Sequence, residues 1–80
     1  MIGKPKYKRG DIVKFKLEEK EYTGTIYYID AYGSLENSND VSYDIFIDNY
    51  FKEGDKNYHI NGNNGCLLKH ITEKLISNKI

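Results

Sequence analysis

The 80-residue sequence predicts an all-β fold, a small barrel of five short strands from which a long hairpin protrudes. The main evidence is residues 22–48, where two segments rich in Tyr, Ile and Val flank a polar run at 31–40. Apolar residues recur on both flanks with a strand-like period, and the polar run supplies turn formers. No segment has the spacing of a long amphipathic helix, and this length corresponds to one domain.

The first strand is predicted at residues 11–17, after a turn centred on Gly10. Three apolar residues alternate there with two lysines, so that Val13, Phe15 and Leu17 take one face and Lys14 and Lys16 the other. The charged residues 18–21 either extend this strand or turn sharply.

The two strands of the long hairpin are predicted at residues 22–30 and 41–48. Gly24 marks a bulge, a bend or a close backbone approach. Ile26 and Ile29 are three residues apart, and a bulge near Tyr27-Tyr28 would turn both isoleucines inward. In the second strand, alternation predicts a core set of Val41, Tyr43, Ile45 and Ile47.

The C-terminal third is predicted to consist of short elements. A loop at 49–57 leads to a strand at 58–60, a hairpin loop at 61–65 and a strand at 66–68. One 3₁₀ turn is expected at 69–71, and 72–76 is either a closing strand or a helical turn.

Charge is balanced, with 12 basic and 12 acidic residues, but it is unevenly spread. We expect a flexible basic arm at 1–9, one barrel domain at 10–76 and a tail at 77–80. No stretch is apolar enough for a signal peptide or a membrane span, and a lone Cys66 suits a reducing compartment. The expected location is therefore the cytoplasm.

A set of residues spread over about 8–76 carries a resemblance to a known fold family: Gly10, Asp11, Val13, Phe15, Gly24, Ile26, Ile29, Tyr43, Ile45, Leu68, His70, Ile71, Glu73 and Ile76. The segments that contain them resemble a small β-barrel of the Src-homology-3 type, with opening strands similar to those of Tudor and KOW modules. The resemblance implies a strand, a 3₁₀ turn and a closing strand at the C-terminal end.

The chain is also similar to short uncharacterised proteins of Gram-positive bacteria and their prophages. This similarity implies a phage or mobile-element protein that binds a host protein as an inhibitor or adaptor, with inhibition of host defence as one such role. We expect no enzymatic activity and no cofactor, because no nucleophile accompanies the carboxylates in a pocket. No metal is expected either, since His59, Cys66 and His70 lack zinc-ligand spacing.

The predicted partner-binding surface is aromatic and acidic. If the alternation of the second hairpin strand holds, Phe46 points outward, between Asp44 and Asp48. Tyr is well suited to interfaces, because its ring buries area while its hydroxyl stays hydrated. The expected contact residues are Tyr27, Tyr32, Phe46, Asp44 and Asp48.

Two alternatives remain open from the sequence. A face for nucleic acid or another anionic ligand would consist of Lys8, Arg9, Lys14, Lys16 and Tyr28. The second alternative is sequestration of a nucleotide-like small molecule in a pocket between subunits, which requires an oligomer. A homodimer formed by pairing of edge strands is compatible with either.

Overall fold

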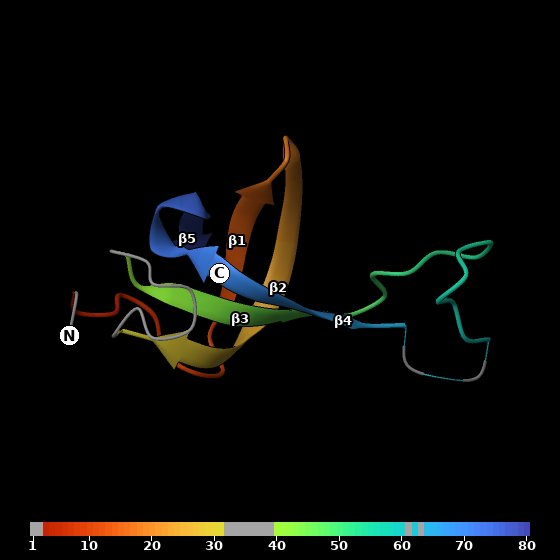
Figure 1. Ribbon diagram of the computed structural model, residues 1–80, viewed down its shortest axis with the longest axis horizontal. Coiled ribbons are helices and arrows are strands. Elements are labelled where there is room, and N and C mark those ends of the chain that lie inside the picture. The colour runs from red at the N-terminus through yellow and green to blue at the C-terminus, as the bar shows by residue number, and fades with distance from the viewer. Residues whose placement is uncertain (1–2, 32–39, 61, 63) are drawn as a thin grey trace.

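A computed structural model describes residues 3–31, 40–60, 62 and 64–80 of the chain. Five antiparallel strands form one sheet in the order β4-β3-β2-β1-β5 (Figure 1), which confirms the all-β prediction. The elements are β1 (Ile12–Leu17), β2 (Lys20–Asp30), β3 (Ser42–Ile47), β4 (Cys66–Thr72), the 3₁₀ turn η1 (Glu73–Leu75) and β5 (Ile76–Lys79).

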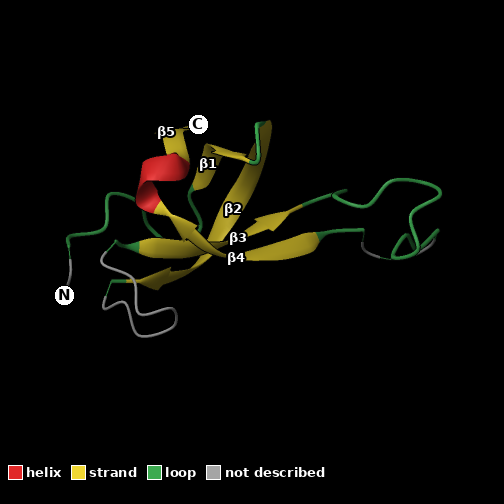
Figure 2. Cartoon of the chain, turned by 45° about the horizontal axis from the view of Figure 1, so that its top comes forward, coloured by secondary structure: helices red, strands yellow, loops and turns green. Residues whose placement is uncertain are grey.

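The sheet is strongly curved. β1 and the first part of β2 run across the direction of β3 and β4, and the long strand β2 belongs to both groups (Figures 1 and 2). β4 and β5 are the two edges, and within the described ranges no hydrogen-bonded ladder joins them. The core lies on the inner side of this curve, so the outer face is convex.

β1 follows the predicted alternation. Val13 and Phe15 are fully buried, Leu17 packs against the core, and Lys16 is exposed. Leu17 pairs with Lys20, so Glu18 and Glu19 form a two-residue turn, and the sharp-turn alternative is the one observed.

The bulge in β2 occurs where the sequence predicts it. The register with β3 shifts between Ile26 and Tyr28, which leaves Tyr27 as the extra residue. Ile26 is fully buried, and Ile29 packs against the core from a half-buried position. The predicted core set of the following segment is also confirmed, because Val41, Tyr43, Ile45 and Ile47 are all buried.

The predicted strand at 58–60 is wrong. Tyr58 N–H donates to the Asp55 carbonyl and His59 N–H to Asn64 Oδ1, so these backbone groups are held by local turns rather than by a neighbouring strand. The described residues between β3 and β4, at 48–60, 62, 64 and 65, instead belong to a long connection that extends away from the sheet (Figure 1). Parts of the predicted 31–40 tip and 61–65 loop lie outside the described residues.

The C-terminal elements are of the expected kinds but are shifted along the chain. β4 continues through 69–71, where a 3₁₀ turn was predicted, because a bulge absorbs this segment. His70 adopts a φ of 61° at the bulge, and its N–H donates to Asp44 Oδ1 at 3.2 Å. The 3₁₀ turn follows at Glu73–Leu75, and β5 includes residues 77–79 of the predicted tail.

The described residues of the N-terminal arm contact the sheet. The Tyr7 ring meets the buried Tyr43 ring edge-on at 5.8 Å, and Lys6 N–H donates to Glu73 Oε2 at 3.2 Å. Lys8 N–H donates to Asp11 Oδ2 at 2.8 Å. These contacts hold the backbone of the arm at Lys6 and Lys8 against the rest of the domain. Within the described ranges, no helix has the length and apolar character that a membrane crossing requires.

Candidate functional site

Strand register brings apolar side chains into one row across the outer face. Ile12 lies opposite Thr25, Thr25 opposite Phe46, and Phe46 opposite Leu67. Residues directly opposite each other in antiparallel strands project from the same face of the sheet. Ile80 extends this row beyond β1, because its N–H donates to the Ile12 carbonyl at 2.8 Å.

The bulge in β2 places two tyrosines on the outer face beside this row. The Tyr27 ring stacks on Phe46 with the ring centroids 5.5 Å apart, and Tyr28 lies opposite Asp44 on the next pair. Tyr27 is 51% exposed and Tyr28 52% exposed. We call the resulting surface the outer ridge, and it consists of Ile12, Tyr27, Tyr28, Phe46, Leu67 and Ile80.

The outer ridge contains most of the exposed large hydrophobic side chains of the described residues. Among the described residues, six large hydrophobic side chains are exposed, and five of them belong to the ridge. The sixth is Ile60, in the long connection between β3 and β4. A concentration of exposed apolar side chains on one face of a small domain is typical of an interaction site.

The acidic flank predicted from the sequence divides into two parts. Asp48 follows β3 and is exposed, but Asp44 is half-buried and accepts the His70 N–H. Asp44 lies between the bulges of β2 and β4, so it supports the sheet as well as bordering the ridge. Tyr32, the remaining predicted contact residue, lies outside the described residues.

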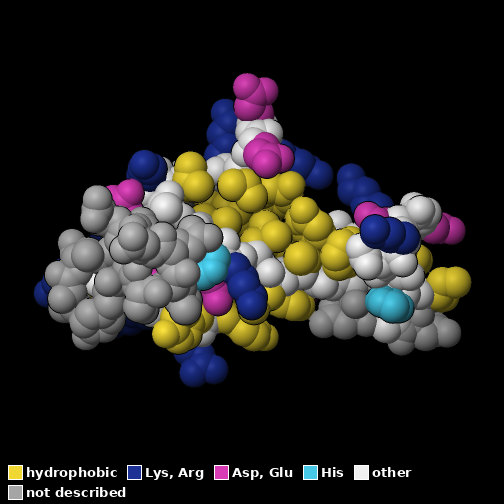
Figure 3. Space-filling view, viewed as in Figure 1, with side chains coloured by type: hydrophobic (Ala, Val, Ile, Leu, Met, Phe, Trp, Pro, Cys, Tyr) yellow, Lys and Arg dark blue, Asp and Glu magenta, His cyan; other side chains and the backbone are white. Residues whose placement is uncertain are grey.

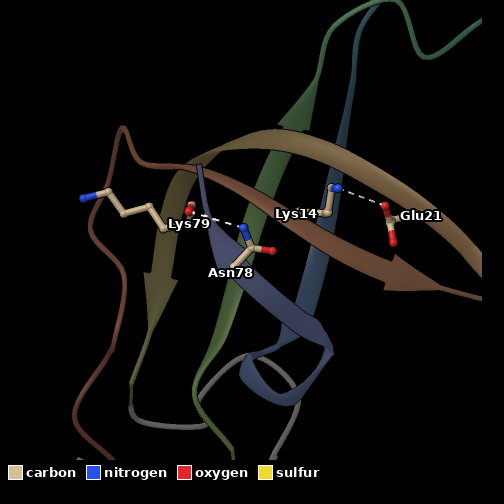
Figure 4. Close-up of polar contacts among 4 residues, drawn as sticks. All are labelled: Lys14, Glu21, Asn78 and Lys79. Atoms are coloured by element: carbon tan, nitrogen blue, oxygen red, sulfur yellow. Dashed lines mark hydrogen bonds and ion pairs between the residues drawn. The ribbon is translucent and has the colours of Figure 1, made fainter.

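The residues predicted for an anionic ligand come from three segments: the arm before β1, β1 itself and β2. Lys14 and Lys16 lie on β1, and Lys14 Nζ is 3.3 Å from Glu21 Oε1 (Figure 4). Glu21 also lies directly opposite Lys16. Tyr28 lies further along β2, where that strand pairs with β3. A carboxylate therefore accompanies the two lysines, while the tyrosine belongs to the outer ridge.

Lys8 and Arg9 precede β1 and are both exposed. The Lys8 backbone N–H stabilises the carboxylate of Asp11 and lowers the pKa of Asp11, with a further contribution from Lys79, whose Nζ lies 3.5 Å from Asp11 Oδ1. At the end of β5, the Asn78 side chain donates to the Lys79 carbonyl (Figure 4).

The inner side has an aromatic stack that the sequence does not reveal as a unit. Phe15 stacks on Tyr22, Tyr22 on Tyr50, and Tyr50 meets Phe51 edge-on. A hydrogen bond with Tyr22 raises the pKa of the Tyr50 hydroxyl, and Lys20 Nζ lies 5.4 Å from the Tyr22 ring centroid. Figure 3 shows hydrophobic side chains gathered on this side, between the β1–β2 hairpin and the connection after β3.

A pocket of about 340 Å³ lies where the N-terminal arm meets η1, and we call it the arm pocket. Its lining residues are Gly3, Lys4, Lys6, Asp40, Val41, Glu73 and Lys74. Sequence reasoning missed this pocket because its walls come from three segments that are distant in the chain. Sequence reasoning also missed Ile12 and Leu67 as surface residues, although strand alternation is a signal that could have placed each on the outer face. Alternation in the β3 segment did predict that Phe46 points outward.

No family model, no curated protein and no solved structure matches this chain. Within the described ranges, no group of three or more His, Cys, Asp or Glu side chains is arranged to hold a metal ion.

Proposed function

We propose that this protein is a non-enzymatic binding module that holds a protein partner on the outer ridge. The observation that carries the proposal is the concentration of exposed apolar side chains, since five of the six among the described residues lie on this surface. Two of these five are tyrosines, and Tyr27 is stacked on Phe46. Aromatic residues dominate the binding energy of many protein interfaces.

The shape of the ridge indicates what kind of surface the partner presents. The ridge runs over the convex side of a curved sheet, so a concave partner surface contacts more of it than a flat or convex one. A groove with an apolar floor would cover Tyr27, Phe46 and Leu67 together. Basic residues at its rim would complement Asp48, which is exposed at the end of β3.

Protein fits the ridge better than nucleic acid does. Nucleic-acid affinity depends on cations that can neutralise phosphates. Glu21 accompanies both Lys14 and Lys16, and Asp44 and Asp48 border the aromatic pair. These carboxylates oppose the approach of a polyanion to the ridge.

We further propose that the sheet is a small barrel of the Src-homology-3 type. The succession of β4, η1 and β5 supports this, because a strand, a 3₁₀ turn and a closing strand is the ending that the resemblance implies. The proposed setting is a phage or mobile element, with the partner a host protein that the module inhibits or recruits.

Phe46→Asp tests the proposed function. A charge at the centre of the ridge should remove at least about 90% of partner capture, because a buried unpaired carboxylate opposes binding by more than 1.4 kcal/mol. The measurement is affinity capture of the tagged protein from nuclease-treated lysate of its natural host, read by mass spectrometry. Ile60→Asp is the matched control, since it places the same charge on an exposed apolar site away from the ridge.

Thermal unfolding followed by circular dichroism shows whether the Phe46→Asp variant still folds. If it does not, Tyr27→Ala serves instead, because the Tyr27 side chain is half exposed. A partner held equally by the wild type and by a folded ridge variant would refute the outer ridge as its binding site. A captured species that disappears after nuclease treatment would favour nucleic acid.

A further inference from the structure

A defined set of contacts places the N-terminal arm at the arm pocket. Tyr43 O–H donates to Glu73 Oε2 at 2.5 Å, and Lys6 N–H donates to the same oxygen at 3.2 Å. Tyr7 packs on Tyr43 at the same place. The arm is thus fixed beside η1, and Lys4 and Lys6 line one wall of the cavity.

Gly3 permits this close approach of the arm. A Cβ atom added at Gly3 would lie 3.3 Å from Val41 Cγ2, which is tighter than an ordinary contact. The arm therefore passes directly against Val41, which contributes the apolar part of the lining.

The charges lining the pocket favour an anion. Three lysines line the cavity, namely Lys4, Lys6 and Lys74, against two carboxylates. Glu73 already accepts two hydrogen bonds, and Asp40 Oδ2 lies 3.7 Å from Lys74 Nζ. Both partners of this ion pair are more than half exposed, and such pairs contribute little. An entering anion can therefore replace Asp40 as the partner of the Lys74 ammonium group at a small cost in free energy.

The size and lining of the cavity limit the ligand. A volume of about 340 Å³ is near the lower end of the range for small-molecule sites. The lining residues of the described chain include no aromatic ring on which a nucleobase could stack. We propose that the arm pocket binds a compact phosphate-bearing small molecule through Lys4, Lys6 and Lys74, from within a single chain. This site is separate from the outer ridge.

Titration with inorganic phosphate, followed by ¹H–¹⁵N NMR at ionic strength held constant with chloride, tests the proposal. We expect saturable shifts of the backbone amides of Lys4, Lys6, Val41 and Lys74. Lys4→Gln with Lys6→Gln should weaken binding at least about tenfold, because lysine contributes to phosphate binding mainly through its charge. Lys14→Gln with Lys16→Gln removes the same charge from β1 and should leave the affinity within about twofold.

Glu73→Gln separates binding from support of the fold. The amide oxygen can still accept the Tyr43 and Lys6 hydrogen bonds, but the negative charge is gone. We expect phosphate to bind a few-fold more tightly to this variant, whereas a residue that only holds the arm would not produce a gain.

Three further ligands show whether the pocket recognises the phosphate group itself or the molecule that carries it. Ribose 5-phosphate and AMP should bind with affinities within about twofold of each other, and adenosine should not bind. Adenosine binding as tightly as AMP would overturn the proposal, as would linear, non-saturating shifts or equal weakening by the two lysine pairs. All these titrations use the free protein, so they succeed or fail independently of partner capture by the ridge.

Discussion

At the scale of single residues, Gly24 shows how closely two strands approach. An added Cβ atom would lie 2.6 Å from the Phe46 carbonyl oxygen and 2.6 Å from Ile45 Cγ2. Neither atom can withdraw freely, because one is backbone and the other belongs to a fully buried side chain. Gly24 was expected to mark a bulge, a bend or a close backbone approach, and the structure shows the close approach, against β3.

Gly24→Ala should lower the free energy of unfolding by about 1–3 kcal/mol, the usual cost of overpacking a core. For a domain of this size, each kcal/mol corresponds to roughly 4–8 °C in melting temperature. Urea unfolding followed by circular dichroism measures the loss. Thr23→Ala, an exposed neighbour on β2, is the control. An unchanged midpoint for Gly24→Ala would show that the two strands have room to separate.

The Tyr43 hydroxyl is the second decisive group at this scale. Burial, together with the hydrogen bond to Glu73, raises the pKa of Tyr43 above its ordinary value near 10. A raised pKa in the folded state means that the stabilisation is complete below pH 10 and is lost as the pH rises beyond it. The protein should therefore lose stability in alkaline solution partly through this group.

Tyr43→Phe should cost about 1.5–3 kcal/mol at neutral pH, the range for a hydrogen bond to a charged acceptor. It should also flatten the fall in stability above pH 10. Urea midpoints measured at several pH values between neutrality and pH 11 give both quantities. Tyr28→Phe removes an exposed hydroxyl and should change neither. The same alkaline slope in Tyr43→Phe and the wild type would contradict the assignment.

At the scale of elements, the β1–β2 hairpin has a turn that its residues do not favour. Glu18 and Glu19 adopt φ angles of 51° and 66°. Two-residue hairpin turns with positive φ at both positions prefer Asn-Gly, because the backbone of residues other than Gly, Asn and Asp is strained there. The alternation of β1 and the pairing of β2 impose this turn against local preference.

Replacing Glu18-Glu19 by Asn-Gly should raise the free energy of unfolding by about 1–2 kcal/mol, since it relieves strain at both positions. Thermal and urea unfolding measure the gain. The control is Gln at both positions, which removes the same charges and keeps both Cβ atoms. If Gln-Gln stabilises the protein as much as Asn-Gly does, repulsion between the two carboxylates, and not backbone strain, limits the wild-type turn.

The elements predictable from sequence are those whose partners are close in the chain. β1, β2 and β3 follow from alternation, and the Tyr27 bulge from the three-residue spacing of Ile26 and Ile29. β4 was misjudged because its bulge depends on Asp44, which holds the His70 N–H from another strand. Tyr58 to Ile60 have strand-like residues, but within the described part of the chain they pair with no neighbouring strand.

At the scale of the whole molecule, the alternation within single strands predicted the residues at the centre of the outer ridge but not those at its ends. Tyr27 and Phe46 were expected to contact a partner, and both lie on the ridge. Ile12 and Leu67 join them only through a register that spans four strands. The arm pocket depends on tertiary contacts of Tyr43 with Glu73 and with Tyr7 of the arm. These residues are far apart in the chain, so no local sequence pattern predicts the contacts.

The extra residue in β2 also fixes the parity of that strand. Before the bulge, inward side chains fall at even positions such as Tyr22 and Ile26, and after it they fall at the odd position Ile29. Because a strand repeats every two residues, the same residues in a regular strand without the bulge would exchange inside and outside for everything beyond Tyr27. Tyr28 would turn into the core and Ile29 into water. The binding surface and the core of this protein therefore depend on the same single-residue count.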